Sequence, residues 1–280
     1  MTTRTAHARI PRVMGILNVT PDSFSDGGSV TDTSGAVDVG AAVSRARQIV
    51  DSGADVLDVG GESTRPGAAP VPVDIECARV LPLLEALRAE YGGEFPIPIS
   101  VDTRRARVAA EAAARGTRII NDTSALRDDP ELAAVVAAEG LDVVLMHRQG
   151  TPETMQDDPR YDDVVAEVRA FFDERVAAAT AAGISTERII LDPGLGFGKE
   201  RDDNYRLVAA LTELRVKGLP MLVGASRKSF LDRFHPVPFA ERLPGSLAFA
   251  AAAAQVGAEW VRVHDVAETV AFLRTLEALQ

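Results

Sequence analysis

Polar and ionisable side chains recur along this sequence, each directly after a short apolar run. Their types are carboxylates, amides, hydroxyls and bases, which can exchange protons, hold anions or ligate a hard metal ion. Any single one has a simpler explanation, because Asp or Asn after a strand often caps the next helix or begins a turn. Capping does not account for a set that ends in an arginine and a histidine. The set comprises Asn18, Asp58 with Glu62, Asp102, Asn121 with Asp122, His147, Asp192, Ser226 with Lys228, and Arg262 with His264.

The last apolar run, at 260–263, places two basic side chains together. Strand alternation puts Arg262 and His264 on one face and the valines at 261 and 263 on the other. If the basic face points inward, the buried guanidinium needs an anionic partner. A bound phosphate would satisfy both groups. The alternative is a salt bridge from Arg262 to an acid on a neighbouring strand, with His264 as a structural hydrogen-bond donor.

The elements that position these side chains follow from a regular alternation of strand-like and helical patterns, as in repeated βα units. Strands are predicted at 13–19, 54–59, 98–101, 118–120, 142–146, 188–191, 220–224 and 260–263. Helices are predicted at 37–51, 75–91, 105–115, 131–139, 162–182, 204–217, 239–257 and 266–278. Glycines at the predicted C-terminal ends of helices support these boundaries, because glycine readily adopts the left-handed backbone conformation that often terminates an α-helix. They are Gly53, Gly116, Gly140, Gly183, Gly218 and Gly257.

The βα repeats predict a single α/β domain. Strands buried on both faces give continuous apolar runs in either a closed barrel or an open doubly wound sheet. Eight units favour a closed (β/α)₈ TIM barrel, in which the C-terminal strand ends meet at one rim and carry the active site. The barrel domain is predicted over 13–280, after an N-terminal extension at 1–12.

Composition places the chain among ordinary globular proteins, with 46% hydrophobic and 25% charged residues. Cys77 is the one cysteine, and the polar start at 1–12 does not resemble a secretion signal, so a cytoplasmic location is expected. The most continuous apolar stretch, 248–254, is too short to span a bilayer. A net charge of −11 argues against nucleic acid or an anionic membrane as a partner.

Three connections are long enough, or rich enough in glycine, to contact a ligand. Two polar connections, 18–28 and 60–67, follow the first two strands, and both could close over a bound molecule. The same composition also suits inert surface loops. The glycine-rich segment 192–199 follows the sixth strand and lacks the Walker pattern.

The motifs at these positions resemble those of the dihydropteroate synthase family. They are the first loop at 18–28, the second loop with Gly-Glu-Ser-Thr-Arg-Pro-Gly at 61–67, the turn at 226–228, and Arg-Val-His-Asp at 262–265. These motifs occur in the family's order and with compatible spacing. The resemblance implies a folate-biosynthesis transferase that condenses (7,8-dihydropterin-6-yl)methyl diphosphate with 4-aminobenzoate, giving 7,8-dihydropteroate and diphosphate. It also implies a Mg²⁺ cofactor, a homodimer formed through outer helices, and membership in a family targeted by sulfonamides.

The resemblance further implies roles for individual residues. The pterin pocket is assigned to Asp102, Asn121, Asp192 and Lys228, with Met146 and Phe197 as apolar walls. Diphosphate binding is assigned to Thr64, Arg262, the backbone of Val263, and His264. Contacts to 4-aminobenzoate are assigned to Phe24, Arg65, Pro66 and Ser226, and the magnesium ligand is Asn18.

Catalysis is implied for Asp102, Asp192, Lys228 and Asp26, the last by organising the first loop. We expect the carbon–oxygen bond to break first, with the two other aspartates offsetting the charge of the pterin cation and the loops excluding water. No protein nucleophile is required. One departure from the family pattern is Arg148, where relatives often carry methionine.

Two alternative functions remain at this point. A pterin-dependent methyltransferase barrel could share the pterin-binding carboxylates and amide, because a fold does not fix a function. It should lack the aminobenzoate loops. A non-catalytic pterin-binding paralog should have lost Asn18, Lys228 or the basic pair, and this chain retains them all.

Overall fold

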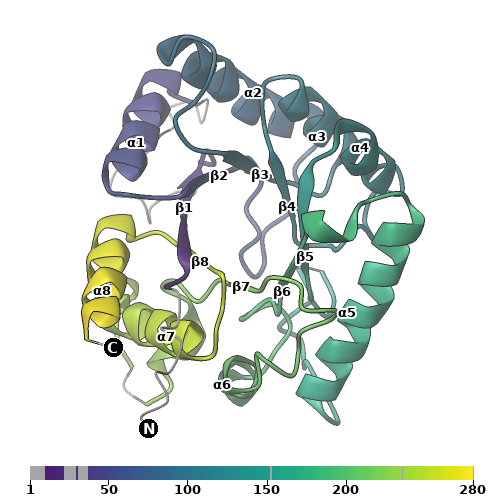
Figure 1. The fold of residues 1–280 in the computed structure, drawn as a ribbon, viewed down its shortest axis with the longest axis vertical. Coiled ribbons are helices and arrows are strands. Elements are labelled where there is room, and N and C mark those ends of the chain that lie inside the picture. The colour runs from purple at the N-terminus through teal and green to yellow at the C-terminus, as the bar shows by residue number, and fades with distance from the viewer. Residues whose placement is uncertain (1–9, 22–29, 31–36, 152, 235, 280) are drawn as a thin grey trace, which may run out of the picture.

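A ring of parallel strands surrounded by helices forms the protein (Figure 1). The structure is a computed structural model that describes residues 10–21, 30, 37–151, 153–234 and 236–279. Within those residues the strands are β1 (Arg12–Asn18), β2 (Val56–Gly60), β3 (Ile99–Asp102), β4 (Ile119–Asp122), β5 (Asp142–Met146), β6 (Ile189–Asp192), β7 (Leu222–Val223) and β8 (Trp260–Val263). Most of the predicted extension at 1–12 lies outside the described residues.

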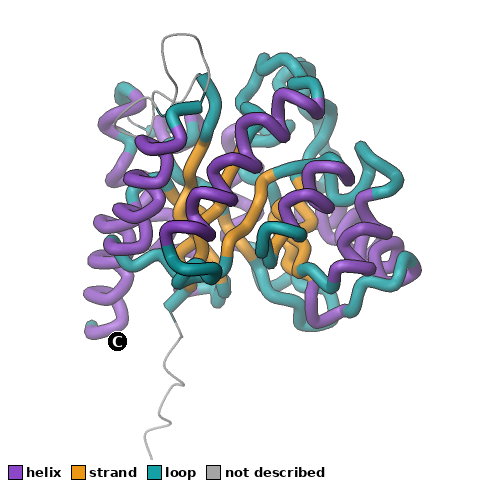
Figure 2. Tube along the Cα trace, turned by 90° about the horizontal axis from the view of Figure 1, so that it is seen from above, coloured by secondary structure: helices purple, strands orange, loops and turns teal. Residues whose placement is uncertain are grey.

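The helices form the outer layer, while the strands form the inner one (Figure 2). In the described ranges the α-helices are α1 (Val39–Asp51), α2 (Val73–Glu90), α3 (Ala106–Ala113), α4 (Leu132–Glu139), α5 (Val164–Ala181), α6 (Arg201–Ala209), α7 (Leu243–Gln255) and α8 (Val266–Ala278). Short 3₁₀ turns cover Thr186–Arg188, Ser229–Asp232 and Phe239–Glu241. None of these helices combines the length and the apolar character that a membrane span requires.

The sheet closes on itself between β6 and β7. Its strand order is β6-β5-β4-β3-β2-β1-β8-β7, and each neighbouring pair in that order runs parallel. The two ends meet through a parallel bridge between Leu191 and Met221, where the Leu191 N–H donates to the Pro220 carbonyl at 2.9 Å. The predicted TIM barrel is therefore confirmed.

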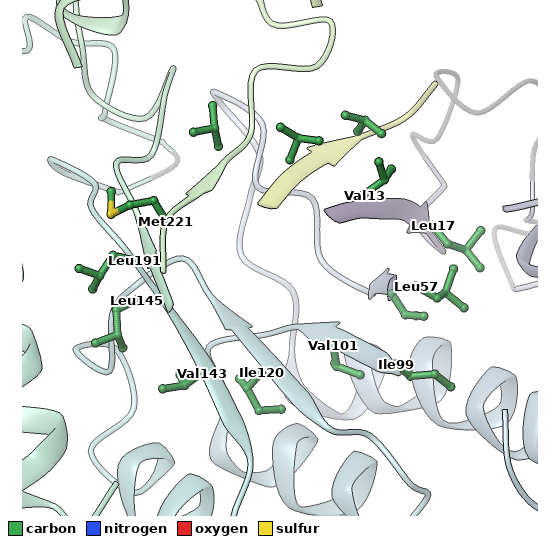
Figure 3. Packing of buried hydrophobic residues seen from close by; sticks show 14 of the residues in the cluster. Val13, Leu17, Leu57, Ile99, Val101, Ile120, Val143, Leu145, Leu191 and Met221 are labelled. Atoms are coloured by element: carbon green, nitrogen blue, oxygen red, sulfur yellow. The ribbon is translucent and has the colours of Figure 1, made fainter. Parts of the chain in front are cut away.

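Both faces of the strands are buried, which explains their continuous apolar sequences. Side chains such as Val101 and Ile120 lie on the helix side of the strands, in the main hydrophobic core (Figure 3). Alternate residues point into the barrel and form a second apolar cluster. Its members are Met14, Val56, Ile119, Val144, Ile190, Leu222 and Trp260.

The predicted element boundaries lie within about two residues of those in the structure except at α6 and at the start of α7, where a separate 3₁₀ turn at Phe239–Glu241 precedes the helix. All six glycines proposed as helix ends have a positive φ, as a left-handed C-cap requires. The prediction of a sixth helix at 204–217 was wrong at both ends. The helix begins at Arg201, where Asp203 accepts the backbone N–H of Glu200 at 3.0 Å, and it ends at Ala209, after which the chain forms separate turns.

Candidate active site

A polar layer lies inside the barrel, directly beyond the interior apolar cluster. Because side chains two residues apart on a strand share a face, the cluster members Val56, Ile119 and Ile190 are followed by Asp58, Asn121 and Asp192 on the same inward face. In the same way, Trp260 is followed by Arg262 on β8. The strands therefore turn from apolar to polar at one level of the barrel, close to their C-terminal ends.

Arg262 is the centre of a buried ion cluster. Its Nε donates to Oδ2 of Asp58 at 2.7 Å, and its Nη2 donates to Oδ2 of Asp102 at 2.8 Å. Asn121 donates through Nδ2 to the same Asp58 oxygen at 3.2 Å. The cluster thus joins β2, β3, β4 and β8. Arg262 is paired with strand-end acids, but these lie on β2 and β3 and not on β1 or β7, the strands that adjoin β8.

Burial controls the titration of this layer. It raises the pKa of Asp102, the cation of Arg262 opposes that shift, and the charge of Asp58 adds to it. Burial also raises the pKa of Asp192, against the attraction of Lys228. It lowers the pKa of Lys228 to about 8, although Asp192 acts in the opposite direction. Such desolvated, mutually coupled groups are typical of functional sites.

Gly224 lies close to three of the polar side chains of the interior. A Cβ placed on this glycine would lie 3.9 Å from Oδ2 of Asp192, from Nζ of Lys228 and from Cβ of Arg262. Nζ of Lys228 donates to the Leu195 carbonyl and lies 4.5 Å from the centre of the Phe197 ring. The amine, the carboxylate and the aromatic wall therefore face a common region of the interior.

The glycine-rich segment after β6 is held tightly against the end of β5. Gly194 adopts a φ of +64°, and its N–H donates to Oδ1 of Asp192 at 2.7 Å. A Cβ at Gly194 would lie 1.9 Å from the His147 carbonyl oxygen, so this approach requires glycine. Lys199 is buried in the same segment, with Nζ 2.9 Å from Nδ1 of His147. These contacts fix the orientation of Asp192.

Ser226 connects the ends of β7 and β8. Its Oγ accepts the backbone N–H of His264 at 3.1 Å and lies 3.0 Å from Nδ1 of the same residue. Burial lowers the pKa of His264 to about 3, and neighbouring cations, including Arg262 and Arg65, add to the shift. His264 is therefore a neutral hydrogen-bonding group at neutral pH, and the charge of Arg65 lies close enough to influence it.

The second loop, the connection at 60–67 that follows β2, lies at the rim above the polar layer. Thr64 is half-buried, whereas Arg65 and Pro66 are exposed. The predicted first-loop residues Phe24 and Asp26 lie outside the described residues.

Asn18 offers the donor type that the expected metal prefers. It ends β1 beside Gly60, where an added Cβ would lie 3.1 Å from its amide oxygen Oδ1. Magnesium takes hard oxygen donors, keeps several waters, and commonly shares one or two protein ligands with substrate phosphates. A single amide oxygen at the barrel mouth therefore fits that ion. The described part of the chain holds no group of three or more His, Cys, Asp or Glu side chains arranged for a metal.

Comparison with known proteins identifies the family. Residues 14–264 match the model of a family described as pterin binding enzyme. The dihydropteroate synthase of Escherichia coli K12 is 50% identical over 268 residues, which are 96% of this chain and 91% of that protein. The chain belongs to the dihydropteroate synthase family.

Solved structures of dihydropteroate synthases share the fold of this family member. A Yersinia pestis dihydropteroate synthase in complex with a sulfonamide drug has a TM-score of 0.88 and 44% identity, over 100% of this chain and 98% of that one. A Xanthomonas albilineans dihydropteroate synthase in complex with 7,8-dihydropteroate has a TM-score of 0.82 and 44% identity, over 97% and 94% of the two chains.

The structure brings most of the predicted pterin residues into one interior region, comprising Asp102, Asn121, Asp192, Lys228 and Phe197. Met146, another predicted wall, is buried at the end of β5. Sequence reasoning noted Asp58 as a strand end but gave it no role, although it contacts both Arg262 and Asn121. The signal that could have found it is an aspartate within the otherwise apolar run Val-Leu-Asp-Val-Gly.

Proposed function

We propose that this protein is a dihydropteroate synthase, which condenses (7,8-dihydropterin-6-yl)methyl diphosphate with 4-aminobenzoate to 7,8-dihydropteroate and diphosphate. The observation that carries the proposal is the convergence of Asp102, Asn121, Asp192 and Lys228 inside the barrel, in a chain 50% identical to a dihydropteroate synthase. The names of the related structures support the substrate class, because one contains 7,8-dihydropteroate and another a sulfonamide drug.

The pterin would occupy the interior polar layer. Its amino-pyrimidinone edge presents several donors and acceptors, which need partners when the ring is buried. Carboxylates of Asp102 and Asp192 suit the guanidine-like edge, and the amide of Asn121 can both donate and accept. Lys228 supplies a donor for a ring acceptor, with Met146 and Phe197 as apolar walls. The carboxylates would also offset positive charge that develops on the pterin as its bond to oxygen breaks.

The diphosphate would lie at the rim, next to Thr64, Arg262, His264 and the backbone of Val263. Arg262 uses Nε and Nη2 for its carboxylates, while its Nη1 hydrogen-bonds to none of the residues that the structure describes. That nitrogen remains to donate to a phosphate oxygen. A Mg²⁺ ion held by Asn18 would supply additional positive charge to the departing diphosphate.

The second substrate, 4-aminobenzoate, would enter between the two loops. Arg65 offers a cation for its carboxylate, Pro66 an apolar surface and Ser226 a hydroxyl, with Phe24 and Asp26 contributing from the first loop. The bond from the pterin methylene carbon to the diphosphate oxygen would break first, and the amine nitrogen of 4-aminobenzoate would then form the new bond to that carbon and lose a proton. Closed loops would keep water from trapping the pterin cation.

We also propose a homodimer in the cytoplasm. The exposed ring of Phe234, which follows the 3₁₀ turn at Ser229–Asp232, has its centroid 5.7 Å from that of Tyr205 in α6, and an exposed aromatic side chain beside an outer helix supports self-association. Analytical ultracentrifugation should give twice the chain mass, and cell fractionation should recover the protein with cytoplasmic markers. A monomer at micromolar concentration would contradict the proposed homodimer. Recovery of the protein outside the cytoplasmic fraction would contradict the proposed location.

The assay supplies the two substrates and Mg²⁺ to purified protein and measures dihydropteroate and released diphosphate in equal amounts. Lys228→Ala should lower kcat/KM by roughly a hundredfold, because it removes a buried donor from the pterin pocket. Lys217→Ala, which removes an exposed lysine, is the matched control and should keep wild-type activity. Absence of product with the wild-type protein, or an unaffected Lys228→Ala variant, would overturn the proposal.

A further inference from the structure

The second loop is closed at its base by a buried carboxylate. Glu62, the second residue after the end of β2, accepts the backbone N–H of Val71 through Oε1 at 2.8 Å. This bond joins the two ends of the connection that carries Thr64, Arg65 and Pro66. The side chain of Glu62 is only 8% exposed, so the bond is protected from competing water.

Arg104 holds that carboxylate from the end of β3. Its Nε donates to Oε2 of Glu62 at 3.0 Å, and its Nη2 donates to Oε1 at 3.0 Å, which is a bidentate pair. Burial alone would raise the pKa of Glu62, but the hydrogen bonds from Arg104 and Val71 outweigh it and leave the pKa below its ordinary value. Glu62 is therefore ionised, as a bidentate partner of arginine should be.

Arg104 is itself fixed by a second carboxylate. Its Nη1 donates to Oδ2 of Asp128 at 2.7 Å, and Asp128 also accepts from Nη2 of the buried Arg148 at 2.6 Å. The chain of contacts therefore runs from the second loop, across the ends of β3 and β4, to the end of β5. Such a network leaves the Arg104 side chain little freedom.

The backbone next to Glu62 is held as well. Arg79 of α2 donates through Nη1 to the Gly61 carbonyl at 2.9 Å, and a Cβ at Gly61 would lie 2.7 Å from a Val80 methyl group. The segment 63–67 is thus anchored at both ends, while Arg65, Pro66 and Gly67 themselves are exposed. An anchored base with an exposed tip is the arrangement expected of a loop that must present side chains in a defined place.

We propose that Glu62 and Arg104 are positioning residues that hold the second loop in the conformation that receives 4-aminobenzoate. This inference rests on the proposed function and extends it, because neither residue is assigned to the substrates. Both act through Arg65 and Pro66. Among the described residues, the two side chains hydrogen-bond to each other, to the Val71 N–H and to Asp128, and to none of the interior pterin residues.

The test compares Arg104→Met and Glu62→Gln with Arg107→Met, a matched control that removes an exposed arginine of α3. In the first two variants the KM for 4-aminobenzoate should rise roughly tenfold, as expected for losing a charge-assisted hydrogen bond. Affinity for 6-hydroxymethyl-7,8-dihydropterin, which reaches only the interior layer, should stay within about twofold of wild type. Arg104→Lys, which keeps one bond, should recover part of the loss.

Hydrogen exchange provides a readout independent of activity. In Arg104→Met, peptides covering 63–71 should exchange roughly tenfold faster than in the wild type, whereas peptides of β3 and α3 should not change. An unchanged KM for 4-aminobenzoate, or equal losses for both ligands, would overturn the positioning role. Absence of product with the wild-type protein would instead refute the proposed function, while faster exchange at 63–71 would still show that the pair orders the loop.

Discussion

Arg262 is the shared counterion of two buried carboxylates as well as a proposed ligand for diphosphate. Its side chain is 20% exposed, whereas those of Asp58 and Asp102 are 0% and 7% exposed. Two carboxyl groups face one guanidinium, and the charge of Arg262 opposes the rise in the pKa of Asp102, so loss of the arginine would leave both groups without their buried counterion. The same residue therefore matters for stability before any substrate is bound.

Arg262→Met should accordingly lower both turnover and stability. We expect the free energy of unfolding to fall by about 3–5 kcal/mol, because a buried ion pair is broken from one side. Urea denaturation monitored by circular dichroism measures this change. Arg160→Met, which removes an arginine whose side chain is 80% exposed, should change stability by less than about 0.5 kcal/mol. A variant as stable as the wild type would show that the two carboxylates do not need this counterion.

At the residue scale, sequence identified the polar strand ends but did not separate site residues from caps. Asp122 follows Asn121 directly, yet its oxygens accept the backbone N–H groups of Ser124 and Leu126, so it organises a turn. Asn121 points inward to Asp58 instead. Adjacent residues on a strand face opposite sides, and the sequence alone does not say which side is the interior.

At the scale of elements, the loop after β6 depends on a glycine in a crowded, left-handed conformation. Gly194 combines a φ of +64° with close contact to the His147 carbonyl. Gly218 has a similar φ of +73° with no atom within 4 Å of an added Cβ. The two positions share a left-handed backbone conformation, which glycine adopts without strain, and they differ in steric crowding.

Gly218→Ala should therefore lower the free energy of unfolding by roughly 1–2 kcal/mol, which is the strain of an alanine in the left-handed conformation. Gly194→Ala should lower the free energy of unfolding by roughly 3 kcal/mol or more, because the crowded loop must also move to make room for the methyl group. Its turnover should fall as well, since Asp192 accepts the Gly194 N–H and would be reoriented. Thermal unfolding and the synthase assay measure the two effects. Equal destabilisation by both substitutions would argue against the crowding seen at Gly194.

Helix α2 contains a buried acid, Glu76, whose effect on the stability of the protein depends on pH. Glu76 is fully buried, and burial raises its pKa from 4.5 to about 7. The folded protein then binds a proton more tightly than the unfolded chain, so Glu76 lowers stability progressively as pH rises from 4.5 towards 7. Glu76→Gln should remove this loss.

Glu76→Gln should raise the free energy of unfolding by less than about 1 kcal/mol at pH 5 and by roughly 3 kcal/mol at pH 8.5. Denaturant titrations at the two pH values measure it. Glu85→Gln, at an exposed position of the same helix, is the control and should change stability little at either pH. A gain from Glu76→Gln that is independent of pH would contradict a raised pKa in the folded state.

Sequence patterns placed most elements well because burial on both faces leaves a clear apolar signal. The limits of β5, β8 and α8 agree with the predictions at both ends. Helix α6 was misplaced because its start depends on the local hydrogen bond between Glu200 and Asp203, which the apolar period does not record. Strand β7 is shorter than its apolar run, since pairing, and not hydrophobicity, sets the length of a strand.

At the scale of the whole molecule, the barrel is closed unevenly. Strands β1 and β2 pair over five residues, whereas β7 and β8 pair over two, and β6 meets the chain before β7 through the single bridge at Leu191. Fewer ladder hydrogen bonds make local opening easier. The weakest part of the described barrel is therefore the seam that leads directly into Ser226 and Lys228.

Amides of 219–226 should exchange with solvent faster than those of β1 and β2, because opening the seam breaks fewer bonds than opening the opposite wall. Native-state hydrogen exchange with mass spectrometry measures both regions in one sample. If Lys228 contacts the bound pterin as proposed, 6-hydroxymethyl-7,8-dihydropterin should slow exchange at the seam more than at β1 and β2, since ligand binding opposes opening there. If, without ligand, the amides of the seam exchange as slowly as those of β1 and β2, then strand pairing does not determine where this barrel opens.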